Sequence, residues 1–199
     1  MKIISSLIIL LFPIFLHATD LPLDVKQSSL KFTGHAFMHD FNGEAQEFSG
    51  SAQADPQKPE IVVSAKIDIQ TAKMTTFESA RDQNMYDWLH VDANPAINFE
   101  LKDVKLVQGD FDTATKDHPA QFTIGGNFTL NKVTKPLAAS VLGWKAGNLL
   151  IVVGNTKINT ADHGLPIIKQ LFMTVDKEVD VTFYLVFDLP SDLQVPVKH

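Results

Sequence analysis

The stretch VDVTFYLVF, residues 179–187, indicates the fold class, because apolar and polar side chains alternate along it. The apolar face comprises Val179, Val181, Phe183, Leu185 and Phe187, and the opposite face carries Asp180, Thr182 and Tyr184. A period of two residues is typical of a β-strand that turns one face to a core and the other to water. The sequence therefore predicts antiparallel β-structure here.

The same alternation recurs in three earlier segments and defines an inward face in each. These faces comprise Leu30, Phe32, Ala36 and Met38, then Ile61, Val63, Ala65, Ile67 and Ile69, then Phe122, Ile124, Phe128 and Leu130. Four more strands are expected near residues 48–54, 97–107, 137–144 and 149–159, with a turn at Ala146-Gly147-Asn148. About eight antiparallel strands can close into a barrel that side chains or one small ligand fill.

One segment, residues 75–89, has helical spacing instead. Its apolar residues are Phe77, Ala80, Met85, Trp88 and Leu89. Thr75-x-x-Glu78 fits a capping box, and Asn94-Pro95 ends the excursion. We expect this helix to cover an open end of the barrel. A second apolar segment without the strand pattern, residues 164–173, is expected to be either a lid that completes the core or a gate that faces a ligand.

The N-terminus predicts export. Lys2 precedes an apolar run from Ile3 to Leu16, which is too short for a comfortable bilayer span, and Leu16-His17-Ala18 fits a cleavage site. Residues 1–18 are therefore expected to be a signal peptide, with an uncleaved anchor as the alternative. Residues 19–199 are then one domain, periplasmic or secreted, with no later segment as long as a membrane helix.

Charge and composition exclude several classes. The net charge is −6, which disfavours nucleic acid and anionic membrane surfaces as partners. The chain has no cysteine, which excludes disulfides, thiolate metal sites and a catalytic thiol.

No metal site or catalytic residue is predicted. His35 and His39, with Asp40 or His90 nearby, would lie about 13 Å apart in an extended strand, too far to share one ion. Asp40, Asp82 and His163 fit neither a triad nor a carboxylate pair, and no G-x-S-x-G motif occurs. We interpret Arg81 and Asp82 as an exposed pair on the helix or as a structural clamp on the barrel rim.

Three motifs occur in order: Arg81-Asp82-x-x-Met85, Pro95-x-Ile97-x-Phe99, and Gly126-x-Phe128-Thr-Leu-x-x-Val-Thr-Lys-Pro136. Together they resemble the YceI-like family of exported lipid- and polyisoprenoid-binding proteins. The match runs from about Asp24 to Phe187 and includes Ser29 with Phe32, and Phe41-x-Gly43 in the first loop. Lys132 stands where the family usually has glycine, so Asn131 is expected to supply the positive φ of that turn.

The resemblance implies an eight-stranded antiparallel lipocalin-like β-barrel, with one helix after the third strand and a long apolar pore. The expected occupant is an isoprenoid, quinone-like or fatty-acyl lipid. No cofactor is expected, and the protein partner stays open. The alternative is a packed structural or stress-related interaction barrel with no natural ligand.

The residues expected to line the pore combine bulky and small side chains on inward positions. They are Phe32, Gly34, Phe48, Gly50, Ala52, Met85, Phe99, Phe122, Ile124, Gly126, Phe128, Ala139, Phe172, Phe183 and Leu185. Gly126 and Ala139 are expected to face empty volume. His39, Arg81 and Lys169 are the candidates for a polar head group. Entry is expected only past the helix and residues 162–172, because backbone hydrogen bonds seal the wall of a barrel.

Overall fold

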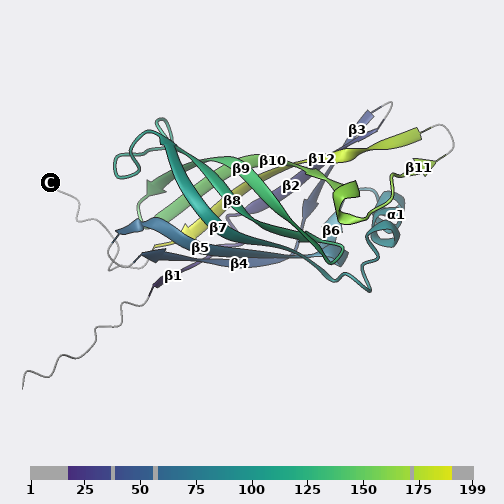
Figure 1. Ribbon diagram of the computed structural model, residues 1–199, viewed down its shortest axis with the longest axis horizontal. Helices are drawn as coiled ribbons and strands as arrows, with labels where there is room; N and C mark the ends of the chain where they lie inside the picture. The colour runs from purple at the N-terminus through teal and green to yellow at the C-terminus, as the bar shows by residue number, and fades with distance from the viewer. Residues whose placement is uncertain (1–17, 37–38, 56–57, 171–172, 190–199) are drawn as a thin grey trace, which may run out of the picture.

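The computed structural model describes residues 18–36, 39–55, 58–170 and 173–189 (Figure 1). The signal peptide predicted for residues 1–18 lies outside these ranges except for Ala18. The strands are β1 (Thr19–Pro22), β2 (Ser29–Ala36), β3 (His39–Ala45), β4 (Phe48–Asp55), β5 (Lys58–Gln70), β6 (Met74–Thr75), β7 (Ala96–Gln108), β8 (Ala120–Leu130), β9 (Val133–Ala146), β10 (Leu149–Asn159), β11 (Lys169–Gln170) and β12 (Met173–Asp188). The helices are η1 (Thr71–Lys73), α1 (Ser79–Leu89) and η2 (Thr160–His163).

The strands form one antiparallel sheet in the order β1-β4-β5-β7-β8-β9-β10-β12-β2-β3-β6, and β11 pairs with β12. The sheet curls on itself, as Figure 1 shows. β1 pairs with β4, while the next residues reach β12: Leu23 bridges to Phe187, and the Asp24 N–H donates to the Val186 carbonyl at 2.8 Å. The N-terminal segment therefore joins two distant strands of the curled sheet.

An all-β antiparallel fold with one α-helix agrees with the prediction, but eight strands is too few. Within the described residues there are twelve. β1, β6 and β11 have only two to four residues, too short to carry a visible period. β3 lies in the predicted first loop and is rich in polar residues. The helix was expected after the third strand. Because three of these extra strands precede it, α1 follows the sixth strand, β6.

One inward face was predicted correctly at Ala65, Ile67 and Ile69, which line the inner cavity, but wrongly at Val63. The pairing of β4 with β5 has register shifts around Gln53 and Ala54, where Ala54 pairs with Val62. Such a bulge exchanges the two faces of a strand. Val62 packs against the core, and Val63 is 48 % exposed.

Helix α1 begins at Ser79, four residues later than the expected N-terminus. Glu78 caps it by accepting from the backbone N–H groups of Ala80 and Arg81. Thr75 belongs to β6 and does not cap the helix, and Phe77 lies outside it with φ 63° and 68 % exposure. No helix in the described ranges is long and apolar enough to cross a bilayer.

Two expected turns are present. Gly147, between β9 and β10, has φ 63°. Asn131 has φ 50° as expected, and Lys132 also has a positive φ of 60°. Two consecutive positive φ values are typical of a type I′ hairpin turn, which matches the twist of the flanking strands.

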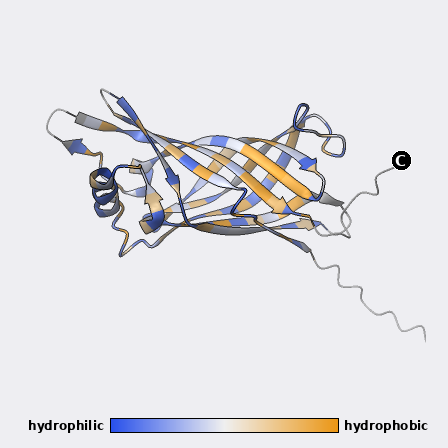
Figure 2. Ribbon diagram, turned by 180° about the vertical axis from the view of Figure 1, so that it is seen from behind, coloured by the Kyte–Doolittle hydropathy of each residue, from blue (hydrophilic) through white to orange (hydrophobic). Residues whose placement is uncertain are grey.

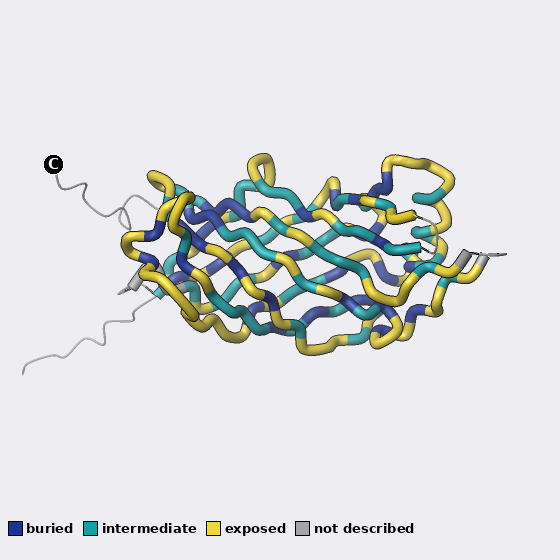
Figure 3. Tube along the Cα trace, turned by 90° about the horizontal axis from the view of Figure 1, so that it is seen from above, coloured by how far each residue is buried: buried dark blue, intermediate teal, exposed yellow. Residues whose placement is uncertain are grey.

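The core has two parts. The larger cluster runs along the inside of the sheet and contains Leu21, Trp144, Val186 and Phe187. The smaller cluster lies beneath α1 and contains Leu89 and Leu165, among others. Figure 2 shows the hydrophobic residues concentrated on the strands, with α1 mostly hydrophilic. Figure 3 shows buried and exposed residues alternating along the wall, as the sequence pattern predicts.

Candidate functional site

Two cavities lie inside the curled sheet. The outer cavity, about 650 Å³, lies beneath α1, and the inner cavity, about 490 Å³, lies farther along the sheet. Five residues line both cavities and form what we call the neck: Leu30, Ile69, Phe128, Ile158 and Val181. All five are apolar, so the boundary that the two volumes share is apolar.

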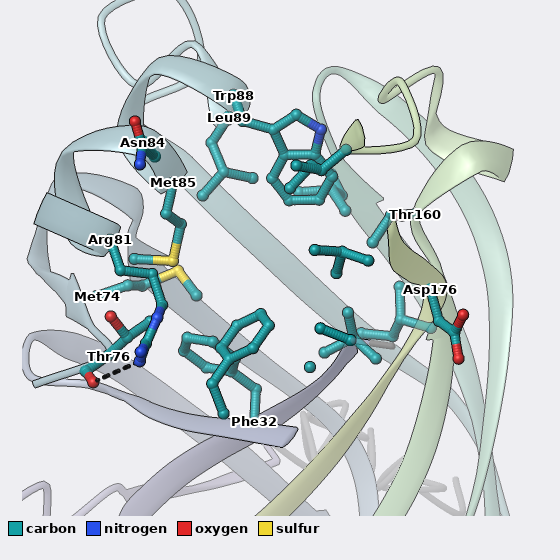
Figure 4. A pocket seen from close by; sticks show the side chains of 18 of the residues that line it. Phe32, Met74, Thr76, Arg81, Asn84, Met85, Trp88, Leu89, Thr160 and Asp176 are labelled. Carbon is teal, nitrogen blue, oxygen red and sulfur yellow. Dashed lines mark hydrogen bonds between the residues drawn. The ribbon is translucent and has the colours of Figure 1, made fainter. Parts of the chain in front are cut away.

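The outer cavity is built from strands on one side and from α1 and the segment after η2 on the other (Figure 4). Phe32 rises from β2 and Met74 from β6, and Met85 and Trp88 face them from α1. His39 and six charged residues also line it: Lys31, Glu78, Arg81, Asp87, Lys169 and Asp176. This cavity therefore combines an apolar interior with a charged rim.

The inner cavity is almost wholly apolar. Side chains of β4, β5, β7, β8, β9, β10 and β12 line it. The only polar residues on its described lining are Asp110, Asp112 and Thr156. Such a surface favours a hydrocarbon occupant, because each buried CH₂ group contributes about 0.8 kcal/mol.

Hydrogen bonds fix helix α1 over the outer cavity. The Asp82 carboxylate accepts from the Thr75 hydroxyl at 2.7 Å and from both the N–H and the hydroxyl of Thr76 at 2.6 Å. The Tyr86 hydroxyl donates to the Met74 carbonyl at 2.6 Å, and the Trp88 indole N–H donates to the Pro166 carbonyl at 2.8 Å. The helix is thus tied both to β6 and to the segment after η2.

The carboxyl group of Asp82 is held in its ionised form. Partial burial raises its pKa, but the hydrogen bonds from Thr76 and Thr75 and the charge of Arg81 outweigh this, so the pKa lies below its usual value. Of the interpretations considered for Asp82, the geometry favours the structural clamp.

Arg81 lies at the rim of the outer cavity. Its guanidinium stands 5.3 Å from the centre of the Phe41 ring, and its Nη1 donates to the Thr76 carbonyl at 3.4 Å (Figure 4). A guanidinium has five N–H donors, so donors remain for an anionic group.

The remaining acid–base candidates do not lie together in one site. His163 is buried, and its Nδ1 lies 2.9 Å from the Val133 carbonyl. The two ring nitrogens of His35 face Asp40 at 2.9 Å and Asp180 at 3.0 Å, and these hydrogen bonds raise the pKa of His35. Among the residues that the structure describes, no group of three or more His, Asp or Glu side chains could hold a metal ion.

Most of the residues predicted for the pore line a cavity. Phe32, Gly34 and Met85 line the outer cavity, Phe128 lines both, and Ala52, Phe99, Phe122, Ile124, Ala139, Phe183 and Leu185 line the inner cavity. The three head-group candidates, His39, Arg81 and Lys169, all line the outer cavity. Phe48, Gly50 and Gly126 line neither cavity, and Phe172 lies outside the described residues.

The expectation that Gly126 faces empty volume is wrong. A Cβ atom there would overlap the Glu100 carbonyl oxygen and would lie 2.6 Å from the Phe99 ring. Gly34 is covered in the same way by Phe41, and Gly43 by Phe32. An aromatic ring that lies across a strand glycine fills the place of its missing side chain.

Other lining residues were missed. Phe41 lines the outer cavity from β3, which was read as a loop. Ile167 and Ile168 also line it, while Leu165 is buried in the core, so the segment after η2 combines the two roles considered for it. Phe111 lines the inner cavity from the loop after β7, and a single aromatic residue among polar neighbours was the available signal.

Comparison with known proteins identifies the family. The family model described as the YceI-like domain matches residues 22–187 of the sequence. The chain belongs to this family. A curated relative from Azotobacter vinelandii, described as a UPF0312 protein, is 31 % identical over 135 residues, which are 62 % of this YceI-like chain and 62 % of the relative. Another UPF0312 protein, from Pseudomonas paraeruginosa, is 32 % identical over 57 % of this chain and 54 % of its own.

The matches therefore span little more than half of the curated relatives' length. Solved structures confirm the fold. BcnA of Burkholderia cenocepacia superposes with a TM-score of 0.69 at 18 % identity, covering 82 % of this chain and 98 % of its own. A domain from Saccharophagus degradans is described as polyisoprenoid-binding and implicated in plant cell wall breakdown. It superposes with a TM-score of 0.64 at 14 % identity, and the match covers 87 % of this chain and 100 % of that domain.

Proposed function

We propose that this chain is an exported binding protein that holds one long apolar lipid, isoprenoid, quinone-like or fatty-acyl, in the two joined cavities. The observation that carries the proposal is the apolar neck, whose five residues line both the outer cavity and the inner one. The volume of about 490 Å³ behind the neck argues against a solidly packed barrel. The description of the Saccharophagus degradans domain as polyisoprenoid-binding supports this ligand class.

Export is part of the proposal. Residues 1–18 act as a leader, and the apolar run from Ile3 to Leu16 behind Lys2 supports this. The role is binding and not catalysis, and the scattered acid–base candidates support that choice.

Blocking the neck tests the proposal. In Val181→Phe the larger ring occupies the passage, so solanesol, a long prenyl alcohol, is expected to bind at least about tenfold more weakly. If the ring keeps two methylene groups of the lipid out of the cavities, the free energy of binding already weakens by about 1.6 kcal/mol, which corresponds to more than a tenfold loss of affinity. The matched control is Val153→Phe, because Val153 is also partly buried but lines neither cavity.

Titration by native mass spectrometry gives both affinity and stoichiometry. The wild-type protein and the control are expected to bind one lipid per chain. Absence of stoichiometric binding of solanesol, oleic acid and a quinone by the wild-type protein would overturn the proposal.

Arg81, at the rim of the outer cavity, predicts a preference for anionic head groups. Arg81→Gln is expected to weaken binding of oleic acid about tenfold more than binding of oleyl alcohol, because only the carboxylate forms charge-assisted hydrogen bonds. Lys73→Gln is the control, since Lys73 pairs with Glu47 and lines neither cavity. Isothermal titration at one ionic strength compares the two ligands. Equal losses would show that Arg81 only supports the fold through Phe41 and Thr76.

A further inference from the structure

The wall of the sheet opens between β5 and β7. These strands pair over five positions, from Gln70 with Ala96 to Lys66 with Glu100, and within the described residues their register ends there. Each strand continues with its other neighbour, β5 with β4 as far as Lys58 and β7 with β8 as far as Gln108. Figure 1 shows the two strands adjacent near β6 and separated at their far ends.

The inner cavity lies directly behind this gap. Val62 and Ala65 line the cavity from β5, and Val104 and Leu106 line it from β7. Although they line an internal volume, Val104 is 38 % exposed and Leu106 is 48 % exposed. Val141 and Leu150, which line the same cavity from fully paired strands, are each 4 % exposed. The cavity therefore reaches the surface where the strand pairing ends.

The loop after β7 contributes to the lining of the inner cavity near this gap. Phe111 is buried there, packs edge-on against Phe122 with ring centres 5.7 Å apart, and carries the Lys145 ammonium over its ring. The premise that backbone hydrogen bonds seal the whole wall is wrong, because β5 and β7, of 13 residues each, pair with one another over only five positions.

We propose that this gap is a side portal of the inner cavity, occupied by the distal part of the bound apolar chain. This inference rests on the proposed function and adds a place for a chain longer than the two cavities: its head lies at the outer cavity and its far end lies against Val104 and Leu106. The rim of the gap is apolar on both sides, which suits a hydrocarbon.

An added peptide strand fits this gap less well. Strand addition needs a regular edge of backbone N–H and C=O groups. β7 has register shifts between Leu101 and Asp103 and again between Leu106 and Gln108, so its edge is irregular along the open part. The occupant is therefore the lipid chain.

Thiol protection tests the portal. The natural chain has no cysteine, so Val104→Cys carries a single thiol, in a nearly isosteric change. The control is Leu142→Cys, because Leu142 has the same 38 % exposure but does not line the inner cavity. The rate of maleimide labelling is measured without ligand, with octanoic acid and with solanesol, and native mass spectrometry records occupancy in each sample.

Solanesol is expected to slow labelling of Val104→Cys at least about tenfold, octanoic acid to leave it unchanged, and neither ligand to affect Leu142→Cys. Stoichiometric solanesol without protection would overturn the portal while leaving the proposed function intact. Equal protection by both lipids would also overturn it, as would protection by an extended peptide but not by lipid. Absence of binding by any lipid would instead overturn the proposed function.

Discussion

Gly126→Leu is expected to lower the free energy of unfolding by about 3 kcal/mol or more, the upper range for overpacking a core. Any side chain at this position meets the backbone carbonyl of Glu100 and the ring of Phe99, and the backbone atom cannot move without disturbing the pairing of β7 with β8. Urea denaturation followed by circular dichroism measures the loss.

Ala139→Leu is the matched control, because Ala139 lines the inner cavity and its added atoms enter that volume. This variant is expected to stay within about 1 kcal/mol of the wild-type stability and to bind solanesol more weakly. Equal stability of Gly126→Leu and Ala139→Leu would contradict the close contact at Gly126.

Asp82→Ala is expected to destabilise the protein by about 3 kcal/mol, because buried donors of Thr75 and Thr76 lose their charged acceptor. Asp82→Asn keeps an acceptor oxygen and is expected to lose less. Asp87→Ala is the control on the same helix, since Asp87 is exposed and its side chain accepts only from Gln83 among the described residues. Asp87→Ala is expected to lower the free energy of unfolding by less than about 0.5 kcal/mol.

The effect of Asp82 depends on pH. Since its pKa in the folded protein is lowered from 3.8, its contribution is fully present above pH 3.8 and is lost as the pH falls through the folded value. The stability difference between wild type and Asp82→Asn is therefore expected to be constant near neutral pH and to shrink in acid. A difference that is unchanged at low pH would show that the charge of Asp82 does not contribute.

Long strands with a clear period could be predicted from the sequence. β8 and β12 follow their alternating patterns, and the turn at Gly147 was visible from its residues. β1, β3, β6 and β11 were missed because short or polar segments become strands only through their partners. The helix was found, but its start was misplaced, since Asp82 accepts from the hydroxyl of Thr75, the residue predicted as the cap.

The candidate site was predictable as a set of inward faces, but its empty volume was not. A small inward residue marks a cavity only if no larger neighbour fills the space, and at Gly126 the Phe99 ring does so. The bulge that turns Val62 inward and the point where β5 and β7 part depend on pairing between strands. No pattern within a single strand records such pairing.

The place of β12 between β10 and β2 also governs the order in which the protein can fold. The meander β7-β8-β9-β10 joins neighbours in sequence and can form early. By contrast, His35 of β2 and its partner Asp180 of β12 are 145 residues apart. Until β12 docks, β2 and β10 each keep an open edge, and the apolar inner face stays in contact with water. Closure of the sheet is therefore expected to be the late, slow step, and the nascent chain is most prone to aggregation before that step.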